Sequence, residues 1–323
     1  MLLVRTGAIG DMIMMTPVFR ALKKAGWHLT LFTTERAWQI VKHDPNIDAV
    51  VFYTRPENDP SPKWEQVDKI KDQYDDVINL SGHLEEKLLV TKGRPAWNWE
   101  HHKRHNACNL NYVENHLAMV EHLEESTAPE LFFTPLEHSE AKRFMKKYRG
   151  KFLVMWLLAG SAFHKIYPFQ EFVARKLMDT YPEIHIHTHG GGIESFLEWN
   201  HPKTKNYSGK WPIRKSMIMT KYVQCVVGTE TGVMNAASCF DTPKVLMLSH
   251  SSVENLSRDW QNTHNIEALD VACHPCHKLA FDLEDCPLDH ELKSPLCMAR
   301  IKPLQVFRAV EEEYLKWKAK RAR

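Results

Sequence analysis

Four cysteines near the end of the chain have a spacing that suits a metal ion. They follow the pattern Cys-x2-Cys-x9-Cys-x10-Cys, at Cys273, Cys276, Cys286 and Cys297. The thiolates of a Cys-x-x-Cys turn can bind one ion, and two further cysteines complete a tetrahedral set. Three prolines make segment 273–297 rich in turns, with little core in which to bury thiols. The spacing therefore favours a structural Fe or Zn site over four unrelated buried thiols, and it does not distinguish the metals. Alternative ligands are His274, His277 and His290.

A second set of polar residues lies near the N-terminus, in the turn Thr6-Gly7-Ala8-Ile9-Gly10-Asp11. Its glycines allow a tight turn and a close approach to a ligand. Asp11 begins a predicted helix, whose dipole favours an ionised carboxylate. Such a group can take a proton from a substrate hydroxyl, although an N-cap is the commonest role for an aspartate at this place. The turn lacks the G-x-G-x-x-G pattern, so nothing indicates a nicotinamide cofactor.

A third candidate site is the loop Gly228-Thr229-Glu230-Thr231-Gly232, which joins a predicted strand to an Ala-rich helix. The unpaired N–H groups at the start of such a helix can bind an anion. Taken alone, the loop fits an ordinary strand-to-helix connection equally well.

The elements that position these residues alternate between strands and helices, which is typical of parallel sheets with crossover helices. Ligands of such sheets bind beyond the carboxyl ends of the strands. The expected strands span 2–5, 29–32, 49–53, 77–80, 152–158, 184–188, 225–227 and 244–248, and the expected helices span 11–25, 111–125, 169–181, 213–222, 231–240 and 307–318. A Pro-rich surface loop is expected over 54–62, and an insertion over 82–128 that does not extend the sheet.

The pattern restarts near Gly150, so we expect two Rossmann-like domains in an α/β fold. Residues 1–150 would form the N-terminal domain and 151–305 the C-terminal one, including the cysteine segment 273–297. Residues 306–323 would form a final helix that packs back toward the N-terminal domain. A length of 323 residues fits two domains.

Composition excludes several classes of protein. Lys and Arg total 42 against 40 Asp and Glu, a balance that argues against a nucleic-acid binder. The longest apolar run, 152–159, is too short to span a bilayer, and the N-terminus has no apolar leader-like stretch. We therefore expect a cytoplasmic protein with reduced cysteines. The basic C-terminal run, 316–323, could touch an anionic membrane surface, although a solvated helix end is the commoner role.

Four motifs in order resemble glycosyltransferase family 9, the ADP-heptose:lipopolysaccharide heptosyltransferase family. They are the stretch from Arg5 to Asp11 with Thr16-Pro17, the stretch from Gly160 to Pro168, the loop and helix from Gly228 to Ala237, and Asp241-Thr242-Pro243. The family resemblance implies a GT-B fold, with the nucleotide sugar on the C-terminal domain and the acceptor on the N-terminal one. It implies an inverting transfer that needs no catalytic divalent cation. The cysteine segment resembles a cysteine-rich finger in the autotransporter heptosyltransferase branch of the family, where that finger holds iron.

The resemblance also implies residue roles. Asp11 would be the general base, and Lys165 would stabilise the leaving diphosphate. Ser161, with the backbone N–H groups of Thr231 and Gly232, would complete a phosphate cradle. Glu194 matches an acidic ribose contact, and Met217 would border the base.

The chain departs from the family pattern at two donor-site positions, where Glu230 replaces Asp and Asn235 replaces His. The donor would thus be ADP-heptose or another nucleotide sugar. The acceptor would be a glycan or a protein hydroxyl, and the basic, aromatic segment 91–106 is a candidate for contacting it, although a plain surface loop fits as well. An inactive GT-B module that binds or regulates is the alternative function. The sequence leaves the oligomeric state open.

Overall fold

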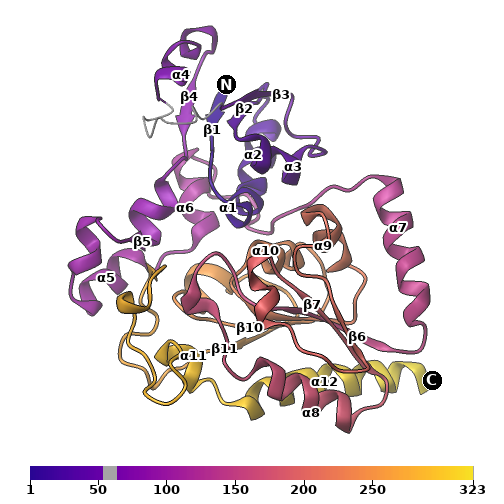
Figure 1. Ribbon diagram of the computed structural model, residues 1–323. Coiled ribbons are helices and arrows are strands. Elements are labelled where there is room, and N and C mark those ends of the chain that lie inside the picture. The colour runs from indigo at the N-terminus through magenta and orange to yellow at the C-terminus, as the bar shows by residue number, and fades with distance from the viewer. Residues whose placement is uncertain (54–63, 323) are drawn as a thin grey trace.

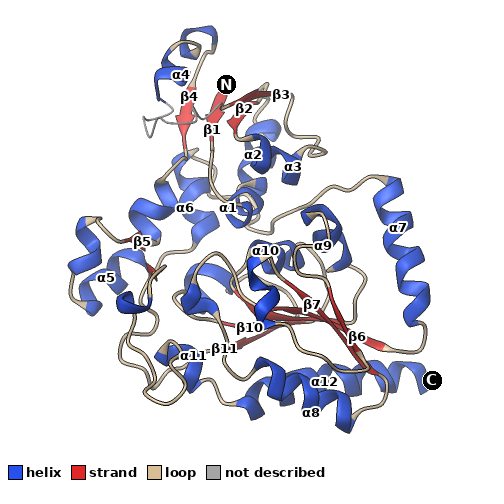
Figure 2. Cartoon of the chain, viewed as in Figure 1, coloured by secondary structure: helices blue, strands red, loops and turns tan. Residues whose placement is uncertain are grey.

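The computed structural model describes residues 1–53 and 64–322, and these fold into two α/β domains (Figures 1 and 2). The N-terminal domain has a four-stranded parallel sheet in the order β3 (Ala49–Phe52), β2 (Thr30–Thr33), β1 (Leu2–Val4), β4 (Val77–Asn79). The C-terminal domain has a six-stranded parallel sheet in the order β11 (Thr263–Ile266), β10 (Lys244–Met247), β9 (Cys225–Thr229), β6 (Phe152–Leu157), β7 (Ile184–His189), β8 (Thr204–Asn206). The α/β fold expected from the sequence is confirmed.

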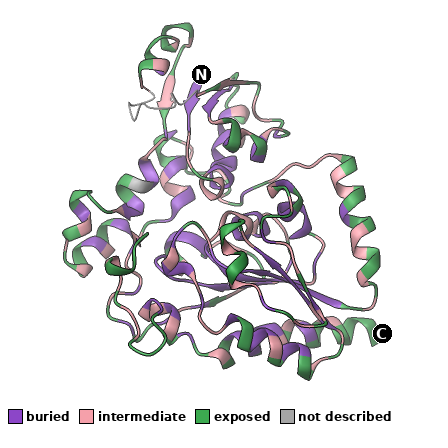
Figure 3. Cartoon of the chain, viewed as in Figure 1, coloured by how far each residue is buried: buried purple, intermediate pink, exposed green. Residues whose placement is uncertain are grey.

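All the strands expected from the sequence are present, and the central strand β6 is buried along its whole length, as its apolar run indicates. Figure 3 shows the strands of the larger sheet buried beneath helices with exposed outer faces. The loop expected over 54–62 falls outside the described residues.

The helix expected over 11–25 is broken in two, into α1 (Ile9–Met14) and α2 (Thr16–Lys24). Pro17 is the cause, because it has no N–H to continue the ladder and is tolerated only in the first turn of a new helix. The Thr16 hydroxyl donates to the carbonyl of Ile13 at 2.9 Å, which closes the junction. The break lets α1 lie across the end of the sheet and present its N-terminus to the other domain.

The remaining helices of the N-terminal half are α3 (Glu35–Val41), α4 (Trp64–Asp68), α5 (His101–Cys108), α6 (Tyr112–Met119) and α7 (Pro135–Met145). Although α7 lies before the expected boundary at 150, it packs against the C-terminal domain's helix α9 (Ile213–Met219). Figure 1 shows it standing beside the C-terminal domain, at the end of a long connection from the N-terminal domain.

The C-terminal domain also contains α8 (Gln170–Thr180), α10 (Gly232–Ser238), α11 (Leu296–Arg300) and the long helix α12 (Pro303–Ala322). The contacts of α12 are with α8, β9, β10 and β11 of its own domain, so the expected packing toward the N-terminal domain is wrong. The reason is its apolar stripe, in which Val306, Val310 and Tyr314 are fully buried, with Tyr314 against Phe152 of β6. Within the described residues, no helix combines the length and apolar character needed to cross a membrane.

The insertion expected over 82–128 does not extend the main sheet. Its short strand β5 (Val90–Thr91) instead pairs in parallel with β12 (Lys278–Leu279), which lies within the cysteine segment. The two domains are therefore joined by a two-stranded sheet whose strands lie far apart in the sequence.

Candidate functional site

The helices α1 and α10 meet at their N-terminal ends, one from each domain. The position that a Cβ would occupy on Gly10 lies 2.6 Å from the side-chain nitrogen of Asn235. The corresponding position on Gly232 lies 2.5 Å from Cγ2 of Ile9 and 3.2 Å from the backbone nitrogen of Gly10. Real Cβ atoms essentially never come within 3.0 Å of another side chain in this way. Gly10 and Gly232 therefore allow the two domains to touch here.

Asp11 sits at this contact, in the first turn of α1 rather than at its cap. Its Oδ2 accepts the backbone N–H of Ala8 at 3.1 Å, which closes the first turn. The same oxygen pairs with the fully buried guanidinium of Arg5 at 2.8 Å, and Arg5 also donates to the carbonyl of Leu80 at 2.7 Å. A Cβ on Gly7 would lie 2.6 Å from this guanidinium, so Gly7 makes room for the ion pair. The geometry thus holds a carboxylate at the domain boundary.

Lys165 belongs to the same cluster, although it comes from the loop after β6. The position of a Cβ on Gly160 lies 3.0 Å from the Lys165 side chain and 3.4 Å from the Glu230 carbonyl, which ties this loop to the one after β9. Burial lowers the pKa of Lys165, while the charges of Glu230 and Asp11 act in the opposite direction. Lys165 is therefore within electrostatic reach of carboxylates from both domains.

The carboxylate of Glu230 is held by a polar loop that follows β10. It accepts the backbone N–H of Ser249 at 2.8 Å, the Ser249 hydroxyl at 2.6 Å and the backbone N–H of Ser251 at 3.2 Å. Glu230 is one methylene longer than the Asp of the family pattern at this position, and its carboxylate makes these three contacts with the loop after β10.

Two histidines lie buried beside the same loop. His164 and His250 share a hydrogen bond between Nε2 and Nδ1 at 2.9 Å, and the other ring nitrogen of His164 contacts the carbonyl of Ala280 at 2.8 Å. Burial lowers the pKa of His164 to about 4 and that of His250 well below its usual range. Both imidazoles are thus neutral near pH 7 and act as a hydrogen-bonded support under the loop.

The other residues predicted for the donor site occupy different surroundings. Asn235 is buried, and its Oδ1 has no hydrogen-bond partner among the residues that the structure describes. Thr231 caps α10 by accepting the N–H of Met234 at 3.1 Å, and Ser161 is exposed. Glu194 folds back over Gly190 and Gly191 on the loop after β7, while Met217 is fully buried in the core.

The structure gathers Asp11, Lys165, Glu230, Thr231, Gly232 and Asn235, and it puts Glu194 on the adjacent loop. Sequence reasoning gave no role to Arg5, Ser249, His164 or His250. The run Ser249-His250-Ser251-Ser252 directly after a buried strand was the available signal, because polar residues at a strand's carboxyl end commonly face a site.

The four cysteines of segment 273–297 are half-buried free thiols, and they lie close enough to interact electrostatically. Burial raises the pKa of Cys276 to about 11 and that of Cys286 to about 12, and neighbouring thiols of the set act in the same direction. In the described part of the chain, three metal-ligating atoms come within 4.8 Å of one another only at His264, Glu312 and Glu313. No three of the four sulfurs therefore lie within 4.8 Å of one another in this arrangement.

The insertion is attached to this segment by its basic and aromatic side chains. Buried Arg104 donates from Nε to the carbonyl of Cys276 and from Nη1 to that of Trp99, each at 2.7 Å. His105 and His277 share a hydrogen bond at 3.0 Å, and Lys92 pairs with Asp285 at 2.7 Å. Several basic and aromatic side chains of segment 91–106, the segment proposed for acceptor contacts, therefore bind the cysteine segment instead. Further contacts are Lys278 over the Trp97 ring and His101 to the Pro275 carbonyl.

Comparison of the whole chain with solved structures identifies its architecture. A glycosyl transferase family 9 structure from Veillonella parvula aligns over 98% of this chain and 97% of its own, with a TM-score of 0.70 at 15% identity. The ADP-heptose LPS heptosyltransferase II of E. coli aligns over 98% and 99%, with a TM-score of 0.67 at 13% identity. The chain has a GT-B fold.

A further similar structure is the iron-containing dodecameric glycosyltransferase TibC of enterotoxigenic E. coli. It aligns over 98% of this chain and 76% of its own, with a TM-score of 0.59 at 11% identity. No family model and no curated protein sequence matches the chain. At these identities the GT-B fold carries over and the activity does not.

Proposed function

We propose that this GT-B protein is an inverting glycosyltransferase that moves a sugar from a nucleotide diphosphate to an acceptor hydroxyl. The observation that carries the proposal is the meeting of α1 and α10, at which Asp11 lies within electrostatic reach of Lys165. A carboxylate from one domain and a buried ammonium from the other are the two charges that such a transfer needs. The buried amide of Asn235 lies at the same contact, and its Oδ1 has no hydrogen-bond partner among the described residues.

The chemistry assigned to these groups is a single displacement. Asp11 accepts the proton of the acceptor hydroxyl, and that oxygen attacks the anomeric carbon from the face opposite the diphosphate. The carbon–oxygen bond to the diphosphate breaks, and its electron pair stays on the leaving group. Lys165 stabilises the charge that develops there, together with Ser161 and the backbone N–H groups of Thr231 and Gly232. We expect no catalytic divalent cation.

The donor assigned to this site is ADP-heptose, the donor of heptosyltransferases that share this fold, or another nucleotide sugar where Glu230 and Asn235 alter selectivity. Glu194 would contact the ribose and Met217 would border the base from within the core. The acceptor would be a glycan or a protein hydroxyl, reached in the cytoplasm. The basic C-terminal end of α12 would contact an anionic membrane surface.

The proposed mechanism makes Asp11→Asn the decisive variant. Asparagine can keep the contact with the Ala8 N–H but cannot take a proton, so turnover should fall by about two to four orders of magnitude. ADP affinity should stay within a few-fold, since Asp11 belongs to the acceptor domain. The measurement is sugar transfer over a panel of ADP-, UDP- and GDP-sugars, with ADP binding by calorimetry.

Two further variants make the result interpretable. Asp48→Asn removes a carboxylate of the same domain that pairs with Lys23, and it should leave turnover unchanged. Lys165→Ala should lose turnover and ADP affinity together. Full activity in Asp11→Asn would overturn the base assignment. Melting-temperature shifts with donor and no consumption of any of them would favour the inactive binding module.

We also propose that the cysteine segment holds a structural Fe or Zn ion through Cys273, Cys276, Cys286 and Cys297. Four gathered thiols are the donor set that these metals prefer. Elemental analysis should find about one ion per chain, and Cys276→Ser should lose it while the exposed-site control Ser161→Ala retains it. An equal metal content in Cys276→Ser would contradict the assignment.

A further inference from the structure

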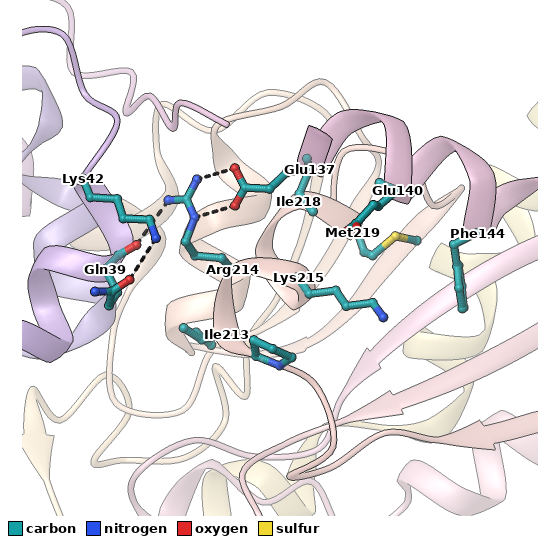
Figure 4. Close-up of a pocket in the computed structure, with 12 residues that line it drawn as sticks. Gln39, Lys42, Glu137, Glu140, Phe144, Ile213, Arg214, Lys215, Ile218 and Met219 are labelled. Atoms are coloured by element: carbon teal, nitrogen blue, oxygen red, sulfur yellow. Dashed lines mark hydrogen bonds and ion pairs between the residues drawn. The ribbon is translucent and has the colours of Figure 1, made fainter. Parts of the chain in front are cut away.

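A pocket of about 400 Å³ lies where α3, α7 and α9 meet, and the proposed reaction makes no use of it (Figure 4). Its walls come from both domains and from the helix that connects them. The volume is within the range of small-molecule sites, which is roughly 300–1,000 Å³. The apolar wall is formed by Ala141, Phe144, Ile213, Ile218 and Met219.

One end of the pocket is closed by Arg214, which is buried and fully engaged. It pairs with both carboxylate oxygens of Glu137, at 2.6 and 3.0 Å, and donates to the carbonyls of Ile40 and Phe132, each at 2.9 Å. The bidentate pair leaves this end without net charge. Arg214 and Glu137 therefore form a wall that fastens α3, the connection and α9 together, rather than a binding group.

The charges that remain at the pocket are mainly positive. Lys42 donates to the neutral amide of Gln39 at 3.0 Å, and the Lys215 ammonium lies 4.5 Å from the centre of the Trp211 ring. Glu140 is the only further acid among the lining residues, so beside the Arg214–Glu137 pair the lining has two ammonium groups and one carboxylate. A ligand that suits such a lining has an apolar body and one acidic group.

The pocket is linked to the candidate site through helix α9. Helix α9 packs against α7 on the pocket side and against α10, whose N-terminus meets α1. A ligand in the pocket would therefore contact the helix that supports the proposed donor loop, and it would also touch α3 of the acceptor domain.

We infer that this pocket is a binding site for a small amphipathic anion, an aryl or acyl acid, and that its occupation stiffens the junction of the two domains. The site is separate from the proposed donor site, and binding there does not require the proposed transfer. Only the effect on ADP binding rests on the proposed function.

The probe is anilinonaphthalene sulfonate, which has an apolar aromatic body and one acidic group and fluoresces when bound in an apolar site. The full chain should bind it saturably, with one probe per chain. Lys215→Glu and Lys42→Glu should each weaken binding by about tenfold or more, since each replaces attraction by repulsion at short range. Lys210→Glu is the matched control, because Lys210 is an exposed lysine outside the pocket, and its affinity should be unchanged.

A third variant fills the pocket. Ala141→Trp should abolish probe binding. If the Ala141→Trp variant does not fold, the two lysine variants still test the inference. The inference would be overturned if both lysine variants bound the probe with the same affinity as the parent chain. Strict competition between the probe and ADP would also overturn it. If the site is coupled to the proposed donor site, the probe and ADP should change each other's affinity by the same factor. Probe binding with the expected lysine dependence and no ADP binding would support the pocket while contradicting the proposed function.

Discussion

At the scale of single residues, three buried arginines fasten the parts of this molecule. Arg5, Arg104 and Arg214 are 0%, 4% and 7% exposed, and each donates to backbone carbonyls of segments far away in the sequence. Arginine suits this task because its planar group offers five donors. The sequence does not distinguish these arginines from surface ones, because arginine is mostly exposed. Only the fold reveals them.

A buried histidine on β7 gives a pH prediction at the same scale. His187 is 1% exposed, its Nε2 has no hydrogen-bond partner among the described residues, and Tyr148 and Tyr207 pack against its ring edge-on. Burial lowers the pKa of His187 to about 3. In the unfolded chain the pKa is about 6.5, so the unfolded state binds the extra proton as pH falls and stability is lost between those values.

His187→Phe should remove this acid sensitivity without losing the aromatic packing. From pH 7 to pH 5 the histidine costs about 2 kcal/mol of unfolding free energy, and the variant should not show that share of the loss. Urea unfolding at pH 7 and pH 5 measures it, with the exposed-site variant His290→Gln as the control. An identical pH dependence in His187→Phe and the parent chain would refute the account.

At the scale of elements, the sequence predicts the regular part of the fold well. Alternation of apolar runs and helical patterns places the strands of the two main sheets up to β10 except the edge strand β8, because buried parallel strands are nearly continuous apolar runs and the three residues of β8 are polar. It misses five helices, α3, α4, α5, α7 and α11, and it does not see the break at Pro17 as the end of a helix. It also cannot predict the pairing of β5 with β12, because two residues carry no register signal and the partners are far apart in the sequence. Of the candidate site, the motif residues were predictable. The polar run after β10 was a signal for Ser249 and His250, whereas nothing in the sequence indicated the buried ion pair of Arg5 with Asp11.

The pairing of the insertion with the cysteine segment gives a prediction for these elements. Arg104→Ala would leave the partly buried carbonyls of Cys276 and Trp99 without this donor, at a cost of up to about 1–3 kcal/mol for each group. Amide exchange over 90–108 and 275–280 should therefore speed up together, while exchange in β6 stays slow. Lys103→Ala is the control, since Lys103 is exposed and only covers the Trp99 ring. Faster exchange in only one of the two segments would show that they are not one unit.

At the scale of the whole molecule, the domains are joined by several separate contacts rather than by a single hinge. They meet where α1 faces α10, where Tyr112 of α6 faces Ser251 and Asn255, at the β5–β12 sheet, and at Arg214. A ligand that enters between α1 and α10 must displace the contact of Ile9 with Gly232. The described arrangement is thus a closed one at the candidate site.

The contact of α1 with α10 can be tested by stability alone. A methyl group on Gly232 would lie 2.5 Å from Ile9 Cγ2, so Gly232→Ala should lower the unfolding free energy by about 1–3 kcal/mol, the usual cost of overpacking. Gly192→Ala is the matched control, because its φ of −60° is ordinary and nothing lies within 4 Å of the added Cβ. It should be neutral or slightly stabilising. In an Ile9→Ala background the clashing Cγ2 is gone, and the cost of Gly232→Ala should fall by about half or more, a coupling that a double-mutant cycle measures. Strict additivity of the two changes would mean that the domains do not touch at this place in solution, and that Asp11 and Lys165 meet only after a ligand draws them together.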